Sequence, residues 1–397
     1  MTTSFISTTR KSKRELNTLI SLTSTFLGVQ LNNPIVIASS PLTESADAIS
    51  KCEEYGAGAV IAKSCSSTRI GEKGYRRCFI DKQGWWAAST FDREIQDVHE
   101  TAIYLKESTS KCSIPIFASV SELTLAPEKW ISTCKTIQDT GVSGIQLDLF
   151  YFENLLGESD FSKNLIELFS SLKDELRIPI FPKLNINLPT LLMSDVFKQA
   201  GIECVSILDS ISLPAPFSVI EEGKPVLRSA TNVSKASLFG EWQYPLTQKY
   251  LYELKSKGFI VCAGGGVQEP INIIELILLG ASAVQLATSI ILNGYHKISH
   301  YVEGVKDYMS QHGFTRIDDF QGKALAYYQG STCYQPSTLL CDETKCIHCG
   351  ICLEQAFCTA ISEKNNKVVI DEQLCDACSL CVDLCPSKAL YLVTMNK

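Results

Sequence analysis

A run of four cysteines near the C-terminus carries the most specific chemistry in this sequence. The run has the spacing C-x₂-C-x₂-C-x₃-C-P, and its members are Cys375, Cys378, Cys381 and Cys385. Thiolates at this spacing bind an iron–sulfur cluster, and the fourth cysteine ligates the other cluster of a two-cluster site. A zinc ribbon also uses C-x₂-C pairs, but four cysteines followed by proline favour iron and sulfur.

An upstream copy of this pattern lacks a fourth cysteine at the usual position. Its members are Cys346, Cys349 and Cys352. Superposition puts Ala356–Phe357 in place of the Cys-Pro pair, and Cys358 comes two residues later than the pattern requires. We expect one [4Fe-4S] cluster on the upstream three cysteines plus Cys385. The downstream three, plus Cys358 if the loop bulges, hold a second one. Otherwise Cys358 is a buried apolar cysteine beside a three-iron or labile cluster.

The composition is that of a globular protein with redox or metal chemistry. Of 397 residues, 45% are hydrophobic, and no apolar run approaches the roughly 18 to 20 residues that span a bilayer. The net charge of −7 disfavours nucleic-acid binding, which depends on clustered Lys and Arg. Seventeen cysteines without a secretion signal argue against a disulfide framework. We expect a soluble cytoplasmic protein that binds neither nucleic acid nor membrane.

The first 14 residues contain no acidic residue, are rich in Ser and Thr, and include four basic side chains. This composition resembles an organelle transit segment, and a frayed basic tail is the alternative.

Eight short β-rich runs recur through the first 290 residues, with helical patterns between most of them. They are Pro34–Ala38, Ala59–Lys63, Pro115–Val120, Ile145–Phe150, Pro179–Leu184, Val205–Asp209, Phe259–Ala263 and Ala283–Thr288. Most are continuously apolar, as parallel strands covered on both faces are. Alternating β and α with a count of eight predicts an α/β fold, a (β/α)₈ TIM barrel, over an open doubly wound sheet.

The helical and turn patterns predict the division of the chain. Helices are expected over 126–140, 164–176 and 270–279, and three long connections follow strands, over 64–112, 150–163 and 210–245. The predicted segments are a tail at 1–22, the barrel at 23–326, a linker at 327–340 and, at 341–397, a bacterial ferredoxin-like α+β domain too small for a hydrophobic core alone.

Ionisable residues end four of the predicted strands, where barrel enzymes place their catalytic groups. They are Lys63, Asp148, Lys183 and Asp209. Core packing seldom buries Lys or Asp without a partner, so the alternative is two structural ion pairs across the barrel top. Gly264–Gly266 after the seventh strand is a tight turn on its own, but together with Thr288 at the eighth it predicts a phosphate cradle.

Five motifs, in order along the chain, resemble the dihydroorotate dehydrogenase family. They are Asn33–Ser40 (NPIVIASS), Ala62–Ser64 (AKS), Pro182–Leu184 (PKL), Gly265–Val267 (GGV) and Gly280–Gln285 (GASAVQ). With the ferredoxin-like tail, the layout is similar to the catalytic part of bacterial dihydropyrimidine dehydrogenase. The resemblance implies an FMN-binding barrel.

The resemblance also implies which residues contact FMN. They are Ala38, Ser39, Ser40, Lys63, Ser64, Lys183, Gly265, Gly266, Ala287 and Thr288. In the family, the residue that matches Lys183 faces the N1/O2 edge of the flavin. The residues that line the flavin match Ala38, Ser39, Lys63 and Ser64. The residues that hold its phosphate match Gly265, Gly266, Ala287 and Thr288. Ser40 replaces a usual Gly, and Ala287 stands where Gly is common.

The substrate side departs from the family. Where the family reads Asn-x-Ser-Cys-Pro-Asn, this chain reads Asp148–Glu153 (DLFYFE), and the strand-six Asn is Asp209. An ionised carboxylate only accepts hydrogen bonds, so Asp148 and Asp209 predict a substrate richer in N–H donors than orotate or uracil. Internal neutralisation by Lys63 and Lys183 is the alternative.

The family's catalytic Cys or Ser has no clear counterpart here. The candidate proton donors of that loop are Tyr151, Glu158, Ser159 and Ser162, and we assign catalysis to Ser159, Tyr151 and Lys63. Cys65 and Cys78 are outside candidates. Trp85 and Trp86 indicate a bulkier substrate or packing under a lid.

Together these features predict an FMN- and iron–sulfur-dependent oxidoreductase that reduces or oxidises a C–C or C–N bond of a small metabolite. No strand–GxGxxG–helix unit is present, so we expect electrons to come from ferredoxin or a separate NAD(P)H-oxidising flavoprotein subunit. A homodimer is compatible with this organisation. The alternatives are a non-catalytic electron-transfer or regulatory subunit and, disfavoured by charge, a tRNA uridine reductase.

Overall fold

The computed structural model describes residues 20–69, 78–80, 87–90, 95–227, 235–328, 330 and 334–394. The chain divides into two compact units, Met1–Tyr328 and Gln329–Lys397. Each unit is described by itself below. The predictions for the first 14 residues and for Trp85 and Trp86 concern positions outside the described residues.

The first unit is a closed parallel barrel. Its strands are β3 (Ile35–Ile37), β4 (Ala59–Ile61), β9 (Ile116–Val120), β10 (Gly144–Asp148), β11 (Ile180–Lys183), β12 (Cys204–Ser206), β17 (Ile260–Gly264) and β18 (Ala283–Leu286). Each pairs in parallel with the next, and β18 pairs with β3 to close the ring. Closure confirms the predicted (β/α)₈ barrel and excludes the open sheet, which would leave two strand edges unpaired.

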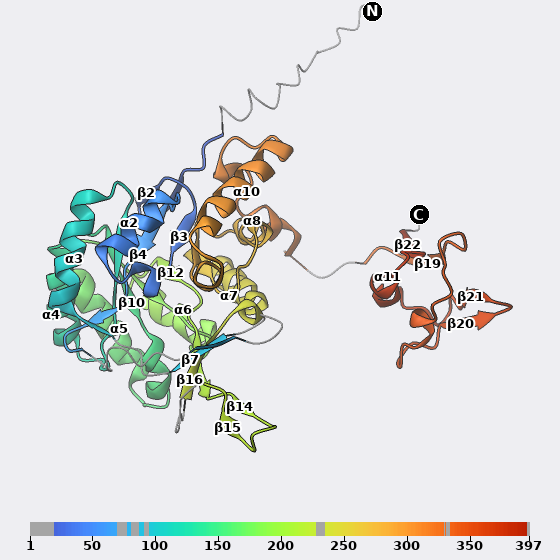
Figure 1. The fold of residues 1–397 in the computed structure, drawn as a ribbon, viewed down its shortest axis with the longest axis horizontal. Helices are drawn as coiled ribbons and strands as arrows, with labels where there is room; N and C mark the ends of the chain where they lie inside the picture. The colour runs from blue at the N-terminus through green and yellow to red at the C-terminus, as the bar shows by residue number, and fades with distance from the viewer. Residues whose placement is uncertain are drawn as a thin grey trace, which may run out of the picture. The chain divides into compact units, whose positions relative to one another are not determined.

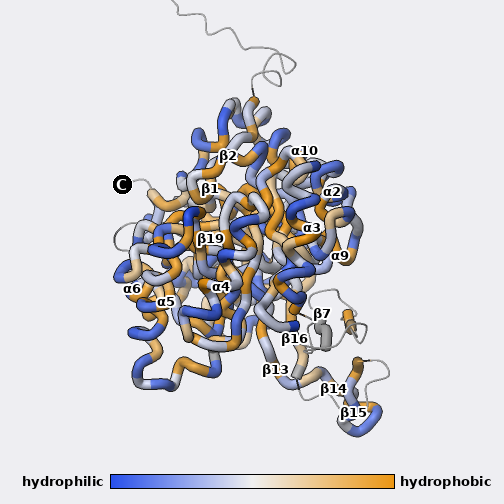
Figure 2. Tube along the Cα trace, turned by 90° about the vertical axis from the view of Figure 1, so that its left-hand side faces the viewer, coloured by the Kyte–Doolittle hydropathy of each residue, from blue (hydrophilic) through white to orange (hydrophobic). Residues whose placement is uncertain are grey.

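Helices follow the strands and pack around the barrel (Figure 1). They are α2 (Ala46–Glu54), α3 (Val98–Lys111), α4 (Pro127–Gln138), α5 (Phe161–Glu175), α6 (Thr190–Gln199), α7 (Tyr244–Ser256), α8 (Pro270–Leu278) and α10 (His296–His312). Helices α4, α5 and α8 correspond to the three helices predicted from the sequence. Apolar and polar residues alternate along α4 and α5, as amphipathic helices require when one side covers a sheet (Figure 2).

A short hairpin closes the end of the barrel where its strands begin. Strand β1 (Ser24–Phe26) pairs with β2 (Val29–Leu31). The Phe26 ring meets Phe181 edge-on with 5.1 Å between ring centroids, and meets Phe117 at 6.0 Å. All three rings are buried, so the hairpin seals the apolar interior from below.

Two long connections, which sequence patterns predict only as loops, form one antiparallel sheet. Its strand order is β13 (Ile211–Pro214), β16 (Lys235–Phe239), β7 (Ala87–Thr90) and β6 (Cys78–Ile80), and we call it the lid sheet. A further hairpin of β14 (Phe217–Ser218) and β15 (Lys224–Pro225) projects away from the barrel (Figure 1). The lid sheet joins segments more than 100 residues apart, and no local pattern in either segment specifies that pairing.

The second unit is built from two strand pairs around the cysteine runs. Strand β19 (Ser337–Cys341) pairs with β22 (Leu390–Thr394), and β20 (Ile361–Lys364) pairs with β21 (Lys367–Ile370). The buried core is small and includes Leu339 and Leu390. Strand β19 begins inside 327–340, the segment interpreted as a linker. The turn-rich composition of that segment concealed a strand whose partner lies 50 residues downstream.

The expected tail is also partly structured. Ser21 donates a backbone hydrogen bond to Thr315, and Ile20 and Leu22 pack against the barrel core.

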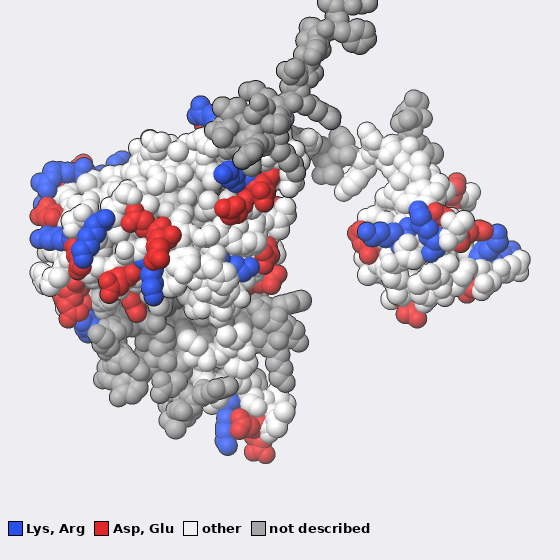
Figure 3. Space-filling view, turned by 45° about the horizontal axis from the view of Figure 1, so that its top comes forward, with Lys and Arg blue, Asp and Glu red and all other residues white. Residues whose placement is uncertain are grey.

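Acidic and basic side chains lie side by side on the face shown in Figure 3, without a broad area of one sign among the described residues. None of the helices in the described ranges has the length and apolar character needed to cross a membrane.

Candidate active site and cluster sites

A cavity of about 300 Å³ opens where the barrel strands end. The side chains and backbone around it come from the ends of β3, β4, β11, β12, β17 and β18 and from the lid sheet. Carboxyl ends of parallel strands converge at one face of a barrel, so residues far apart in sequence meet here. The lining residues are Ala38, Ser39, Ser40, Pro41, Lys63, Cys78, Lys183, Leu208, Asp209, Ser210, Phe239, Gln243, Gly265, Gly266, Val267, Gln285, Leu286, Ala287, Thr288 and Ile291.

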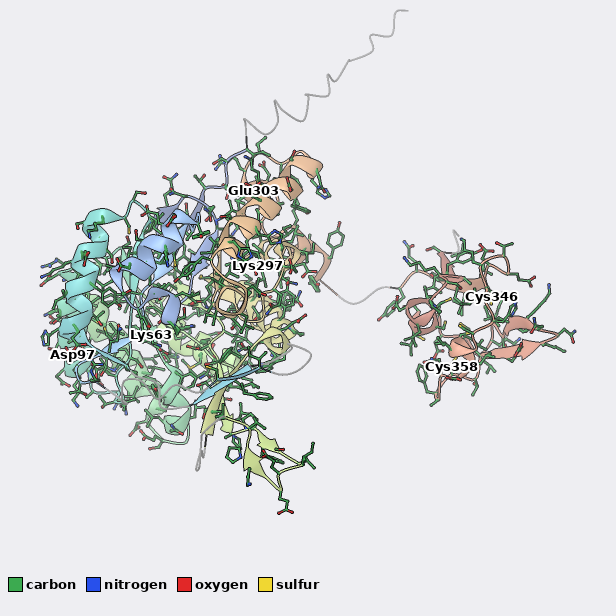
Figure 4. The ribbon with its side chains drawn as sticks, in the orientation of Figure 1. Lys63, Asp97, Lys297, Glu303, Cys346 and Cys358 are labelled. Carbon is green, nitrogen blue, oxygen red and sulfur yellow. The ribbon has the colours of Figure 1, made fainter. Side chains whose placement is uncertain are left out.

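Nine of the ten residues that the family resemblance assigns to FMN line this one cavity. The tenth, Ser64, is buried behind it, and its Oγ lies 3.1 Å from the Oγ of Ser39. Lys63 lies within the body of the barrel unit (Figure 4), where it is 7% exposed. The structure therefore brings the predicted set together around one volume.

The glycine turn after β17 lies too close to the backbone at the start of α7 to hold a side chain. Gly266 has a φ of +79°, and a Cβ added there would lie 2.4 Å from the backbone nitrogen of Tyr244. Gly265 also has a positive φ, of +102°. On the neighbouring strand, Ala287 and Thr288 follow β18 and line the same cavity. Backbone at these two turns faces the same volume, which is the arrangement that holds a phosphate in this fold.

A buried ion pair occupies the same cavity. Lys183 Nζ lies 3.3 Å from Asp209 Oδ2, and the two side chains are 5% and 13% exposed. The other carboxylate oxygen of Asp209 accepts hydrogen bonds from the backbone N–H and the hydroxyl of Ser210. Internal neutralisation, the alternative reading of this carboxylate, is thus what the structure shows for Asp209.

Asp148 does not line the cavity but ends a buried hydrogen-bond chain that begins there. Ser64 Oγ donates to Asp148 Oδ2 at 2.9 Å, and the Phe150 backbone N–H donates to Oδ1 at 3.1 Å. Ser64 Oγ also lies 3.0 Å from Ser119 Oγ and within hydrogen-bond reach of Ser39, which lines the cavity. Both Asp148 oxygens therefore have protein donors. The structure places Asp209 in the cavity lining and Asp148 among buried donors outside that lining.

The candidate proton donors are not gathered at this cavity. Ser159 is exposed between the 3₁₀ segment Phe150–Leu155 and α5, and its neighbour Glu158 lines a separate groove beside α4. Tyr151 is half-buried, with its ring edge-on to Phe150 at a centroid separation of 5.2 Å, and does not line the cavity either. Loop positions in a sequence do not reveal which way the loop turns after the strand.

The two cysteines considered as further candidates for the catalytic residue, Cys65 and Cys78, differ in burial and in position relative to the cavity. Cys65 is fully buried, and burial above all raises the pKa of its thiol well beyond the usual value. Cys78, on β6 of the lid sheet, lines the cavity instead. No local pattern predicts this position of Cys78, because the lid sheet pairs segments that are distant in sequence.

Two further cavity residues were missed by sequence reasoning. Gln243 donates from Nε2 to the backbone oxygen of Asp209 at 2.7 Å. Gln285 donates from Nε2 to Ile207 at 2.6 Å, and no partner is present for its buried Oε1. A buried acceptor of this kind at a cavity wall suits a ligand that carries an N–H donor, as a flavin ring does. Gln285 ends one of the five family motifs, which was the available signal.

In the second unit, the cysteines sort into two neighbourhoods. Burial raises the pKa of the Cys352 thiol, and the nearby Cys346, Cys349 and Cys385 thiols raise it further. The second neighbourhood centres on Cys381. Burial likewise raises the pKa of that thiol, with added effects from Cys378, Cys375 and Cys358. Cys346 and Cys358 lie in separate parts of the unit (Figure 4).

A cavity of about 40 Å³ lies among the cysteines of the first neighbourhood. Within the described residues, no three His, Cys, Asp or Glu side chains converge closely enough to hold one metal ion.

The fourth cysteine of the downstream run is supplied with donors. Burial raises the pKa of Cys385, but hydrogen bonds from the Leu390, Ser387 and Ala389 segment outweigh it and lower the pKa below the usual value. The Ala389 N–H donates to Cys385 Sγ at 3.3 Å. Such donors stabilise a thiolate, which is the form that ligates iron.

Comparison with known proteins agrees with this geometry. The family model "Dihydroorotate dehydrogenase" matches residues 21–309, and "4Fe-4S binding domain" matches residues 368–391. The catalytic subunit of dihydroorotate dehydrogenase B (NAD(+)) from Thermoplasma volcanium is 26% identical, covering 77% of this chain and 98% of its own length. Chloroplastic dihydropyrimidine dehydrogenase (NADP(+)) from Arabidopsis thaliana is 24% identical over 78% of each chain.

A third relative is the catalytic subunit of dihydroorotate dehydrogenase B (NAD(+)) from Methanothermobacter thermautotrophicus. It is 22% identical, over 76% of this chain and 98% of its own length. The family model covers most of the barrel unit, and the iron–sulfur model covers the downstream cysteine run. The predicted family resemblance is confirmed. This chain belongs to the dihydroorotate dehydrogenase family and carries a C-terminal 4Fe–4S binding domain.

Proposed function

We propose that this protein is an FMN- and iron–sulfur-dependent oxidoreductase that adds hydrogen to, or removes it from, a C–C or C–N bond of a small metabolite. The observation that carries the proposal is the cavity at the barrel mouth. Two buried lysines, a glycine turn and a buried unpaired acceptor line one volume of about 300 Å³. An ordinary barrel core has no need of this combination.

FMN fits the residues that are present. The phosphate would be held by the two turns, at Gly265, Gly266, Ala287 and Thr288. The ring would be lined by Ala38, Ser39 and Lys63. Gln285 Oε1 would accept a hydrogen bond from an N–H of the ring. Lys183 would face the edge on which negative charge develops during reduction. When bound, FMN supplies hydride chemistry. The protein's part is to orient the ring, exclude water and place charge.

Two [4Fe-4S] clusters would carry the electrons singly. Cys346, Cys349, Cys352 and Cys385 would hold one cluster, and the second neighbourhood, including Cys358, would hold the other. The two groupings of thiols around Cys352 and Cys381 support this division. The external donor or acceptor would be ferredoxin or an NAD(P)H-oxidising flavoprotein subunit.

The partners of Asp148 and Asp209 bear on whether the substrate has to be rich in hydrogen-bond donors. Asp209 is balanced by Lys183, and both oxygens of Asp148 already accept protein hydrogen bonds. A substrate therefore need not bring positive charge to the site. The lid sheet contributes Phe239 and Cys78 to the cavity wall. A flat, uncharged or anionic ring that stacks on the flavin under this sheet would fit.

A non-catalytic electron-transfer subunit is the second candidate. It is favoured by the location of Ser159 and Tyr151, which lie away from the cavity. Such a subunit would still bind clusters, but it would show no substrate-dependent change of flavin redox state. The buried Lys183 argues for catalysis, because a pure carrier has no need of a cation paired inside the cavity.

Anaerobic reconstitution followed by analysis tests the proposal. Acid-released flavin should approach one FMN per chain, and iron should approach about eight per chain. The flavin is then reduced with dithionite, and the excess dithionite is removed. At least one oxidised ring compound from a panel of pyrimidines, orotate and related compounds should reoxidise it. Flavin binding without reoxidation by any compound would favour the electron-transfer subunit. Protein that takes up no flavin would overturn the proposal.

A further inference from the structure

A fifth cysteine lies at the site of the first proposed cluster. Cys341 is the last residue of β19, and neither cysteine run includes it. The cavity of about 40 Å³ in the second unit is bounded by five cysteines. They are Cys341, Cys346, Cys349, Cys352 and Cys385.

The position of Cys341 is fixed by the fold. Strand β19 pairs along its full length with β22, and Cys341 is opposite Leu390 in that ladder. Leu390 is buried in the small core of this unit, and Cys341 packs against that core. The fifth thiol is therefore held beside the cavity by backbone pairing and does not swing in from a loop.

Cys341 and Cys346 are in direct contact. A hydrogen bond joins the two thiols. Cys352 and Cys385 line the same cavity as this pair. The Cys341 sulfur therefore lies beside a proposed ligand of the first cluster.

We propose that Cys341 and Cys346 are interchangeable ligands of one iron in the first cluster. This rests on the two-cluster function proposed above. In the exchange, the iron–sulfur bond to Cys346 breaks and one to Cys341 forms. The proton of Cys341 moves to the released Cys346 sulfur, so neither iron nor sulfur changes oxidation state. The first cluster can then survive loss of a bond that would otherwise open it to an iron-depleted form.

Alanine variants of the full chain test the exchange by iron content and low-temperature EPR. Cys346→Ala should keep about eight irons per chain, with shifted g-values for one cluster, because Cys341 replaces the missing ligand. Cys341→Ala should also keep about eight. The double variant should fall to about four. Equal loss in Cys346→Ala and in the double variant would overturn the proposal.

The second neighbourhood supplies the matched control. Cys375 has the corresponding place at the start of the downstream run. The thiols that act on Cys381 in that neighbourhood are those of Cys378, Cys375 and Cys358, all already assigned as ligands. Cys375→Ala should therefore lose its cluster and fall to about four irons. Retention of both clusters in Cys375→Ala would show that any single cysteine is dispensable, and would remove the special role of Cys341.

The wild-type protein gives a test that does not depend on the folding of variants. Holoprotein exposed to iodoacetamide, then freed of excess reagent, is separated from iron-depleted chains and mapped by mass spectrometry. Interchange predicts label on Cys341 in some molecules and on Cys346 in others, never on both. Label on Cys341 alone would overturn the proposal. If wild type instead binds only about four irons, the two-cluster function fails first, and the two failures are distinguishable.

Discussion

Lys183 Nζ and Asp209 Oδ2 lie 3.3 Å apart at the mouth of the barrel, with both side chains largely buried. The carboxylate therefore partly cancels the positive charge that Lys183 would otherwise offer to a bound flavin. Charges in a site of low dielectric are weakly screened, so this pairing should affect the redox properties of the flavin.

The first prediction concerns this pair. Asp209→Asn should raise the midpoint potential of bound FMN by about 30 mV or more, because the uncompensated cation stabilises reduced flavin by roughly 1.4 kcal/mol. Lys183→Met should lower the potential and the flavin occupancy. Spectroelectrochemical titration of the two variants and wild type measures both effects. Unchanged potentials in both variants would show that Lys183 does not face the flavin.

Gly266 provides a test of the phosphate cradle. Gly266→Ala should abolish most FMN binding, because its Cβ would lie 2.4 Å from the Tyr244 nitrogen and the turn would have to move. Gly258→Ala is the matched control, since Gly258 has a φ of +90° with nothing within 4 Å of the added carbon. The control should cost only about 1 kcal/mol of backbone strain and keep its flavin. Flavin fluorescence titration compares them, and equal affinity would place the phosphate elsewhere.

Ser64 and Asp148 should be energetically coupled. Ser64→Ala removes a donor from a buried carboxylate and should lower the free energy of unfolding by about 1.5 to 3 kcal/mol. In an Asp148→Asn background the same change should cost less than about 1 kcal/mol, because a neutral amide tolerates the lost donor. Urea unfolding of the four proteins gives the coupling energy. A Ser64→Ala cost that is the same in both backgrounds would contradict the pairing.

The two cysteine neighbourhoods make separate spectroscopic predictions. Cys358→Ala should alter only the cluster near Cys381, whereas Cys385→Ala should alter only the one near Cys352, because the fourth ligand of each run crosses to the other site. EPR of the dithionite-reduced variants at low temperature resolves the two signals. An unaltered spectrum for Cys358→Ala would remove this residue from the ligand set.

Much of the barrel is specified locally. All eight predicted runs overlap barrel strands, with ends shifted by at most three residues, because continuous apolar runs between amphipathic helices have few other ways to be covered on both faces. Local pattern does not specify how the ends of long loops pair. The lid sheet, and with it the place of Cys78, was therefore invisible in the sequence.

Within the candidate site, residues at strand ends could be predicted from the sequence, whereas residues on loops could not. Residues on strand ends, such as Lys63 and Lys183, were found because the barrel fixes where a strand end points. Residues on loops, such as Ser159, were misplaced because a loop can leave the strand in many directions.

By itself, the sequence determined the fold class, the family and the cysteine runs, since each depends on residue type and short spacing. Only the tertiary structure decided which charges meet. In the folded protein Lys183 pairs with Asp209, and Ser64 donates a hydrogen bond to Asp148. Cys341 lies at a cavity that four other cysteines also line. These contacts join residues distant in sequence or separated by a turn, and their energies depend on distance and burial, which a linear sequence does not contain.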